Sequence, residues 1–467
     1  AVAFFVCIVV DGQVTVGGNI FGGGKLAAVG GGSAVTIDQE GAVVGTLEEG
    51  QLVEGTGDVY GGGALADVGS YATDTTSVTL LQGTVRGSIF GGGLGDATHA
   101  AAVKGAVHVS VGVSDGAEPP VYSGEITIHG AVYGCNNTNG SPEDNVTVDI
   151  YKTARTDDQE TSEEGYAIDQ VFGGGRNANY AGATGRRATV NIHGCDNTVR
   201  RVFGGGDAAD ASGVAVVVDG GRYDWIFGGG NGEATEANIG SGGARLTVRG
   251  GKVGHLFGGS NTQGSITGPT VINVNSEGCP SEMDIDEFFG GSNKVPITGA
   301  VTSTIGCGTR FSKVYGGSNA AEIIEGPVTL TIKGGTIGTV FGGSKGVLDD
   351  PLTTDVDESV AATISGNVVL NLYGGTIGNA FGGSDQNGNI TGSITVNVLD
   401  AEDEDCPLNV TNVYGAGNLT AYTPTDATLT SPQVNIRHMK SGNSITGNVY
   451  GGGYGAGATV TANPKVT

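Results

Sequence analysis

Val328–Ser344 reads VTLTIKGGTIGTVFGGS and Val368–Ser384 reads VVLNLYGGTIGNAFGGS, and the two stretches agree at 11 of 17 positions. Leu246–Ser260, LTVRGGKVGHLFGGS, follows the same plan. Their ending, an aromatic residue followed by two glycines and then Gly or Ser, recurs along the chain at intervals of 24 to 43 residues, with small departures in a few copies. The fourteen aromatic residues are Phe21, Tyr60, Phe90, Tyr133, Phe172, Phe203, Phe227, Phe257, Phe289, Tyr315, Phe341, Phe381, Tyr414 and Tyr450. The chain is therefore a tandem repeat.

One repeat predicts three short strands joined by glycine corners. Val328–Ile332 alternates apolar and polar residues, which is typical of a strand with one buried face. Gly334-Gly335 turns the chain, Ile337 anchors a very short second strand, and Val340-Phe341 begins a third. Such a unit cannot bury its apolar face alone, so successive units must stack. The predicted fold class is all-β: a parallel β-helix (β-solenoid) of about fourteen rungs, with the right-handed coiling that parallel crossovers favour.

The composition agrees with a stack of rungs. Glycine makes up 90 of 467 residues and proline only 12, which excludes collagen and disfavours helix. A hydrophobic fraction of 38% argues against disorder. Of the two other β-rich alternatives, a sandwich and a propeller, propeller blades repeat at a steadier spacing of about 40–50 residues. Because stacking places equivalent residues above one another, we expect an aromatic ladder. Hydroxyl and amide ladders are expected from Ser260, Ser292, Ser318, Ser344, Ser384, Asn261, Asn293 and Asn319.

The chain is strongly acidic. Its formal net charge is −26, from 48 acidic and 22 basic residues. Nucleic acid and anionic membranes need a basic footprint, so neither is an expected partner, and no apolar run approaches the roughly 20 residues of a membrane helix. The acidic residues gather in the longer intervals, around 157–164, 349–358 and 400–405, and are interpreted as solvated loops in which Ca²⁺ binding stays open. No cofactor or metal site is predicted.

Few residues carry a chemical signal. No Cys-x-x-Cys or His-Glu-x-x-His occurs, and His129 and His193, which share an Ile-His-Gly context two repeats apart, are interpreted as residues flanking turns. Residues 176–252 hold nine of the 22 basic residues and the only tryptophan. Arginine and aromatic side chains suit an acidic glycan or an acidic surface of a neighbouring subunit, and the alternative is a solvated flank. The ligand-binding candidates, here named the basic belt, are Arg200, Arg201, Arg222, Tyr223 and Trp225.

The two ends of the sequence suggest assembly. We divide the chain into an apolar N-terminal strand, residues 1–20, and a single solenoid, residues 21–467. Ala1–Val10, AVAFFVCIVV, is uncharged and lacks polar alternation, so it either caps its own first rung or completes the sheet of a neighbouring subunit. Tyr450–Gly457 is a standard rung with no amphipathic helix after it, which leaves an edge to pair. The assembly candidates are Phe4, Phe5, Val6, Ile8, Val9 and Val10.

Six cysteines are too few for a disulfide scaffold but fit a secreted protein. Ala1-Val2-Ala3 resembles a signal-cleavage triplet, so we expect a mature secreted chain. Cys279 and Cys307 lie at the same corner of adjacent rungs, about one strand spacing apart, and are predicted to form a disulfide. The remaining cysteines are expected to stay unpaired within the subunit: Cys7, Cys135, Cys195 and Cys406.

The rungs from Phe21 to Gly453 resemble the glycine-rich β-helices of bacterial surface proteins, namely autotransporter passengers, polymorphic outer-membrane proteins and haemagglutinin-like adhesins. The resemblance covers over 90% of the chain and concerns architecture. The Phe-x-x-Asn repeat of the polymorphic proteins is not systematic and the sequence shows no translocator barrel, so no functional residue is carried over. The resemblance implies secretion and surface adhesion.

The sequence predicts a non-enzymatic extracellular structural or adhesive β-solenoid whose copies stack head to tail into a fibre. Its expected partners are copies of itself, with glycans as the second class. One alternative is a monomeric glycan-binding adhesin acting through the basic belt. The other is a β-helix polysaccharide lyase or hydrolase, which would need Ca²⁺-binding carboxylates beside an Arg or Lys base, or paired Asp residues. The regularity of the rungs argues against such an enzyme.

Overall fold

The computed structural model describes residues 5–153, 165–279, 283–349, 358–400, 405–437 and 442–467. They fall into two compact units, Ala1–Gly242 and Gly243–Thr467, here named unit 1 and unit 2 and described separately. The described residues form strands, turns and bends, with no helix among them. The predicted all-β class is confirmed.

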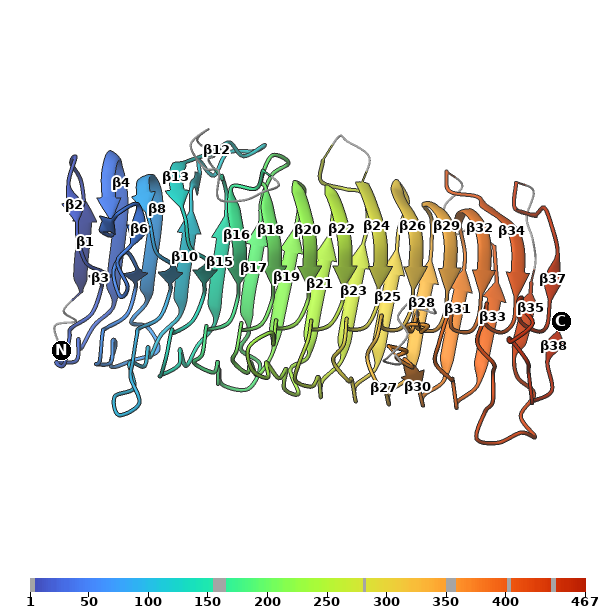
Figure 1. Ribbon diagram of the computed structural model, residues 1–467. Coiled ribbons are helices and arrows are strands. Elements are labelled where there is room, and N and C mark those ends of the chain that lie inside the picture. The colour runs from blue at the N-terminus through green and yellow to red at the C-terminus, as the bar shows by residue number, and fades with distance from the viewer. Residues whose placement is uncertain (1–4, 154–164, 280–282, 350–357, 401–404, 438–441) are drawn as a thin grey trace. The chain divides into compact units, whose positions relative to one another are not determined.

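In unit 1 the chain passes back and forth between two parallel sheets, A and B, so that strands of one sheet lie side by side in successive coils (Figure 1). Two short antiparallel hairpins leave this pattern. Sheet A contains β1 (Val6–Val10), β2 (Thr15–Val16), β4 (Ser33–Val44), β8 (Thr76–Val85), β10 (Val107–Val111), β13 (Glu125–Ile128), β15 (Val146–Ile150), β17 (Ala188–Ile192) and β19 (Val214–Val218). Sheet B contains β3 (Ile20–Phe21), β7 (Val59–Tyr60), β9 (Ile89–Phe90), β14 (Val132–Tyr133), β16 (Ile168–Phe172), β18 (Val199–Phe203) and β20 (Arg222–Phe227). The hairpins are β5 (Leu47–Glu48) with β6 (Gln51–Leu52), and β11 (Val113–Ser114) with β12 (Tyr122–Ser123).

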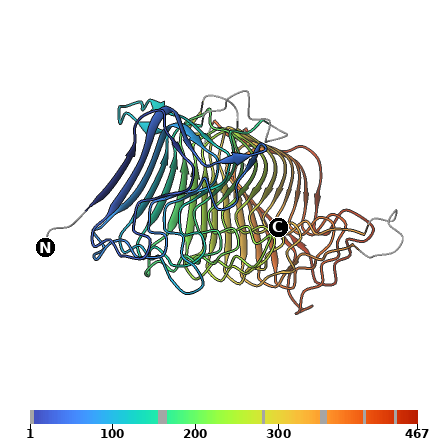
Figure 2. The same cartoon turned by 60° about the vertical axis from the view of Figure 1, so that its left-hand side comes forward.

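Unit 2 has the same two-sheet plan. Sheet A contains β21 (Ala244–Val248), β23 (Thr270–Val274), β25 (Val301–Ile305), β28 (Val328–Ile332), β31 (Val368–Leu372), β33 (Ile394–Val398), β35 (Gln433–Ile436) and β38 (Lys465–Val466). Sheet B contains β22 (Lys252–Phe257), β24 (Met283–Phe289), β26 (Thr309–Tyr315), β29 (Thr336–Phe341), β32 (Gly375–Phe381), β34 (Leu408–Tyr414), β36 (Ser444–Ile445) and β37 (Val449–Tyr450). A further short pair is β27 (Ile323–Ile324) with β30 (Thr363–Ile364). Each unit is therefore a parallel β-solenoid, and Figure 2 shows its successive coils from a second direction.

The rung has two main strands rather than the predicted three. The expected second and third strands are one strand, β29, in which Ile337 and Val340 are both buried. Gly335 makes the turn before it, with a φ of +94° that side chains disfavour. Gly338 makes no corner; it lies inside the strand, where an added Cβ would come within 2.6 Å of the Ser312 carbonyl oxygen. The third side of the rung consists mainly of single β-bridges, such as Ile266 to Ile297.

The core of each unit is built from columns of β-branched and leucine side chains. In β28 the alternate residues Val328, Leu330 and Ile332 are fully buried, as the alternation predicts. Parallel pairing without shifts places Leu330 beside Leu370 of the next rung, so like residues pack on like. Burying such a side chain stabilises the fold by about 1.5–3 kcal/mol, and the contribution repeats in every rung.

The expected aromatic ladder is present in both units. In unit 1 the rings of Phe21, Tyr60, Phe90, Tyr133, Phe172, Phe203 and Phe227 stack with centroids 4.7–5.0 Å apart. In unit 2 the rings of Phe257, Phe289, Tyr315, Phe341, Phe381, Tyr414 and Tyr450 stack at 4.6–5.0 Å. These distances match the spacing of neighbouring strands, about 4.8 Å, so rings and backbones fit one repeat distance.

Unit 2 also contains the expected polar ladders. The Ser260 backbone N–H donates to the Ser292 hydroxyl at 3.1 Å, and the same contact continues through Ser318 and Ser344 to Ser384. Beside it, the Asn319 side-chain amide donates to Asn293, and Asn293 donates to Asn261. These serines are buried, so their ladder satisfies polar groups that would otherwise be desolvated without partners.

In most rungs the glycine after the aromatic residue is required by close approach of two backbones. The Gly204 N–H donates to the Phe227 carbonyl at 3.1 Å, across to the next rung. A Cβ added to Gly204 would lie 2.3 Å from the Gly228 carbonyl oxygen, which no side chain tolerates. The composition of the chain therefore follows from the distance between rungs.

We predict that Gly204→Ala destabilises unit 1 by about 1–3 kcal/mol, because the added methyl group forces the rungs apart. Trp225 is the only tryptophan and lies in unit 1, so its fluorescence during urea unfolding reports this change. Gly18→Ala is the matched control, since a Cβ there meets nothing within 4 Å. An unchanged urea midpoint for Gly204→Ala would contradict the close-approach explanation.

Candidate functional site

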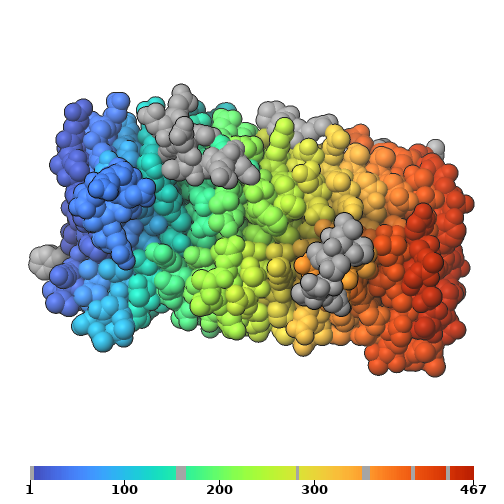
Figure 3. All heavy atoms as spheres, viewed as in Figure 1, coloured from blue at the N-terminus to red at the C-terminus, as the bar shows by residue number. Residues whose placement is uncertain are grey.

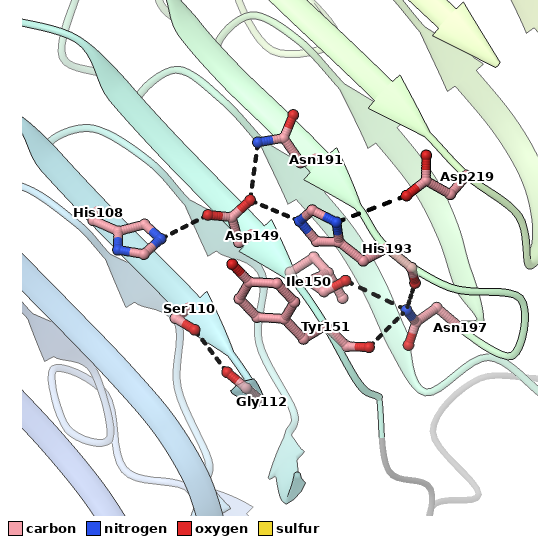
Figure 4. A network of polar contacts seen from close by, with 10 residues as sticks. All are labelled: His108, Ser110, Gly112, Asp149, Ile150, Tyr151, Asn191, His193, Asn197 and Asp219. Atoms are coloured by element: carbon pink, nitrogen blue, oxygen red, sulfur yellow. Dashed lines mark hydrogen bonds and ion pairs between the residues drawn. The ribbon is translucent and has the colours of Figure 1, made fainter. Parts of the chain in front are cut away.

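A polar network lies on sheet A of unit 1, built by residues of four neighbouring strands and the positions just after them (Figure 4). The register of the parallel strands brings these residues together. Asp149 of β15 pairs with Asn191 of β17. Ile192 pairs with Val218, so the residues that follow them, His193 and Asp219, are also neighbours. His108 comes from β10, on the other side of β15. The stack therefore brings together side chains that lie up to about 110 residues apart in sequence.

Asp149 is the centre of the network. One of its carboxylate oxygens lies 2.7 Å from His108 Nε2, and the other lies 2.9 Å from His193 Nε2. The Asn191 amide donates to the second oxygen as well, at 2.9 Å. On the far side of the imidazole, His193 Nδ1 lies 3.7 Å from an Asp219 carboxylate oxygen. Acidic and basic groups thus alternate along one line.

An aromatic side chain covers the central histidine. The ring of Tyr151 stacks on the imidazole of His193, with centroids 4.5 Å apart and an interplanar angle of 13°. Tyr122, from the β11–β12 hairpin, lies 5.7 Å from the Tyr151 ring. Asp149 is only 7% exposed, so the central ion pair is largely shielded from water. Shielding of this kind strengthens the attraction between opposite charges.

The network fixes the charge of its central members. Burial by itself would lower the pKa of His193, but the hydrogen bonds and charges of Asp149 and Asp219 outweigh it and raise that pKa to about 9. Burial opposes ionisation of Asp149 too, yet the hydrogen bonds from His108, His193 and Asn191 hold its pKa well below the usual range. At neutral pH the pair is therefore an imidazolium and a carboxylate.

Sequence reasoning found only part of this network. His193 does follow a strand end, as predicted, but its two carboxylate partners were not foreseen. His108 and Asp149 were missed, because nothing in their local sequence marks them. The available signal was the repeat itself: aligning VTVDI (Val146–Ile150) with ATVNI (Ala188–Ile192) places Asp149 beside Asn191.

The basic belt lies on β18 and β20 of unit 1, and its charges have partners within the unit. Arg200 pairs with Asp169, and Arg201 lies 3.1 Å from Glu233. The Arg222 guanidinium lies 4.1 Å above the ring of Tyr166 and donates to the Gly165 carbonyl. Arg200 and Arg201 are thus paired with carboxylates, and Arg222 is held by a ring and a carbonyl oxygen.

The two aromatic members of the belt differ from the expectation. Tyr223 is only 2% exposed and donates its hydroxyl hydrogen to the Gly220 carbonyl, so it cannot contact a glycan and this assignment is wrong. The alternation of strand β20 turns its side chain into the core. Trp225 is partly exposed and lies parallel to Phe227 at 6.0 Å, packed along the end of the aromatic ladder of unit 1.

The apolar N-terminal segment forms β1, which pairs in parallel with β4 of its own unit from Val6–Ser33 to Val10–Ile37. Within the single chain it is therefore part of the first coil of its own unit. Val10 is buried, whereas Phe5 and Val9 are each 57% exposed. In Figure 3 this first coil, in dark blue, lies at the surface of unit 1. Phe4 lies outside the described residues.

The predicted Cys279–Cys307 disulfide is wrong: Cys307 is bonded to Cys406, with Cα atoms 6.3 Å apart. The bond spans 99 residues and passes two intervening rungs, whose corner residues are Gly334 and Gly374. A Cβ at Gly334 would lie 2.6 Å from the Cys307 sulfur. Because glycine has no side chain, the disulfide can occupy this space. The spacing of cysteines in the sequence gives the number of rungs between them, but it does not show where missing side chains allow a disulfide to form past those rungs.

The other cysteines divide into two groups. Cys195 and Cys279 are also oxidised to disulfides, so the expectation that Cys195 and Cys406 are unpaired is wrong. Cys7, which is exposed, and Cys135, which is buried, are free thiols as predicted. Burial raises the pKa of the Cys135 thiol well above its usual value, which makes it a packed residue rather than a nucleophile.

Comparison with known proteins does not assign the chain to a family, because no family model, no curated protein and no solved structure matches it. In the part of the chain that the structure describes, no three His, Cys, Asp or Glu side chains are grouped to hold a metal ion. The same residues contain no helix long and apolar enough to cross a membrane. Most of the acidic insertions, where Ca²⁺ binding was left open, lie outside the described residues.

We predict that unit 1 loses stability as the pH rises from about 6.5 to 9. A folded-state pKa of about 9 for His193, against about 6.5 in the unfolded chain, stabilises the fold fully below pH 6.5 and is lost above pH 9, an effect of about 3 kcal/mol. Urea unfolding followed by Trp225 fluorescence across this range measures it.

His193→Gln should abolish most of this pH dependence, because glutamine carries no titrating charge. His129→Gln is the control: burial, with Arg86 nearby, lowers the pKa of His129, so it is already neutral in this range. A wild-type stability that stays flat between pH 6.5 and 9 would show that His193 is not held as a cation.

Proposed function

We propose that the chain is a non-enzymatic, extracellular structural β-solenoid whose copies assemble end to end. The observation that carries the proposal is the outermost coil of unit 1. Among the described residues β1 is paired only with β4, and two apolar side chains are exposed there, Val9 within the strand and Phe5 just before it. A strand that has one unpaired edge and exposed apolar side chains is a template for another strand.

The last coil of unit 2 offers a matching surface. Within the described residues, β37 pairs only with β34 and β38 pairs only with β35. Tyr450 closes the aromatic ladder at 43% exposure, while the ladder rings behind it are almost fully buried. Phe21 opens the ladder of unit 1, and like Tyr450 it is followed by three glycines. The ring of Phe21 in a second copy can therefore continue the stack of Tyr450 at the ladder spacing of about 4.8 Å.

Chemistry within the described site supports a structural role. The histidine at the centre of the polar network is held as a cation, and the rungs around it keep their regular pairing. The Cys307–Cys406 disulfide favours an oxidising compartment, which agrees with a location outside the cell. The resemblance of the rungs to those of bacterial surface β-helices points in the same direction.

Assembly is tested by negative-stain electron microscopy of the purified full chain. We expect wild-type filaments whose subunits add along the coil axis. Val9→Lys and Tyr450→Lys should each shorten or abolish them, because a charge on an edge strand blocks strand pairing.

Val121→Lys is the matched control, since Val121 is an apolar side chain exposed to a similar extent as Val9, at 64%, and lies just before β12 in a hairpin that leaves the coils. It should leave filament length unchanged. Wild-type protein that stays monomeric at all concentrations, or Val9→Lys filaments of normal length, would refute end-to-end assembly.

A further inference from the structure

A groove of about 440 Å³ runs along the surface of unit 2, between sheet B and the turns that follow the aromatic ladder. Its volume lies within the range of small-ligand sites, about 300–1,000 Å³. One end of the groove adjoins the ion pair between Lys345 and Glu287. Lys345 follows the turn after Phe341, and its side chain reaches back to the preceding rungs, 3.0 Å from Glu287 and 5.8 Å from the centre of the Phe289 ring, where it covers the ladder.

One wall of the groove is a column of outward residues in register on sheet B: Lys313, Thr339, Asn379 and Asn412. Hydrogen bonds order its amides. The Asn448 backbone N–H donates to the Asn412 side-chain oxygen at 3.0 Å, and the Asn412 amide donates to Asn379 at 3.0 Å. Within the described residues, the Asn379 amide N–H groups and the Lys313 ammonium have no hydrogen-bond partner. This wall therefore presents fixed donors.

The opposite wall presents acceptors and one phenol. Asp385 is only 3% exposed, and its carboxylate accepts hydrogen bonds from the Tyr315 hydroxyl at 2.9 Å and the Asn418 amide at 2.8 Å. These two bonds fix both side chains and leave the Asn418 carbonyl oxygen as an acceptor. Tyr454 is 66% exposed and stands edge-on to the Tyr414 ring, with centroids 5.6 Å apart. The polar groups of this wall are thus pre-organised by the fold.

The floor of the groove is the edge of the aromatic ladder. Phe341, Phe381 and Tyr414 line it, and their exposure increases slightly from one rung to the next. Over these three successive rungs, an apolar strip of stacked rings lies between a donor wall and an acceptor wall. The partner that fits is an extended chain with an apolar face and hydroxyl groups on both sides, because a hydroxyl both donates and accepts.

We propose that this groove binds a neutral, unbranched oligosaccharide laid along the stack of rungs. Charge decides against acidic glycans: the chain carries a net charge of −26, and the groove offers Lys313 alone against Asp385. The site differs from the basic belt, whose arginines are engaged within unit 1. It does not depend on end-to-end assembly, because every residue that lines it belongs to unit 2 of one chain.

The test is isothermal titration of the purified full chain with neutral hexasaccharides of β-1,4-glucan, β-1,3-glucan, xylan and mannan, and with an oligogalacturonate as the acidic probe. We expect at least one neutral hexasaccharide to bind. Asn379→Ala and Tyr454→Ala should each weaken its binding about tenfold, the loss typical of one hydrogen bond or ring contact in a binding site.

Asn371→Ala is the matched control. Asn371 is an amide in a similar ladder, where it donates to Thr331 and accepts from Asn397, but it lies on sheet A, away from the groove. Its substitution should leave binding unchanged.

Tyr454 is exposed, so Tyr454→Ala tests oligosaccharide binding even if Asn379→Ala lowers stability. The proposal is overturned if no neutral hexasaccharide binds, if only the oligogalacturonate binds, or if both groove variants bind as the wild type does. Filament formation is scored separately by microscopy, so the two proposals fail independently.

Discussion

The distance between one rung and the next is the constraint on which both units depend. It is set where glycine lies against glycine after each aromatic residue, as at Gly204 and Gly228, where an added methyl group finds no space. At that distance the backbone hydrogen bonds between parallel strands are made and the aromatic rings stack 4.6–5.0 Å apart. Three interactions of different chemistry thus require one repeat length, and any residue that lengthens it weakens all of them.

The general fold could be predicted from the sequence because the same constraint acts at every rung and therefore produces a repeated sequence pattern. The alternation in Val328–Ile332, the corner at Gly335 and the recurring ring all appear where they were expected. The number of strands per rung was not predictable from glycine content. Gly338 resembles a corner residue in sequence but serves close packing against Ser312, and only the neighbouring rung distinguishes the two roles.

The side-chain sites were less predictable, because their partners come from other rungs. Local composition indicated the basic belt but not Asp169 and Glu233, which pair with Arg200 and Arg201. It marked His193 but not Asp149, whose position depends on the register of two strands more than 40 residues apart. The disulfide shows the same limit, since Cys307 reaches Cys406 past rungs that carry glycine at the corner.

The amide ladders have a direction. In unit 2 each asparagine donates to the rung that precedes it in sequence, from Asn435 to Asn397, from Asn397 to Asn371, and from Asn412 to Asn379. Aligned hydrogen bonds polarise one another, so such a column has a net dipole along the coil axis. Together with parallel strands, this makes the two faces of a coil chemically different. A filament of these chains would therefore be polar, with a donor-rich end and an acceptor-rich end that grow at unequal rates.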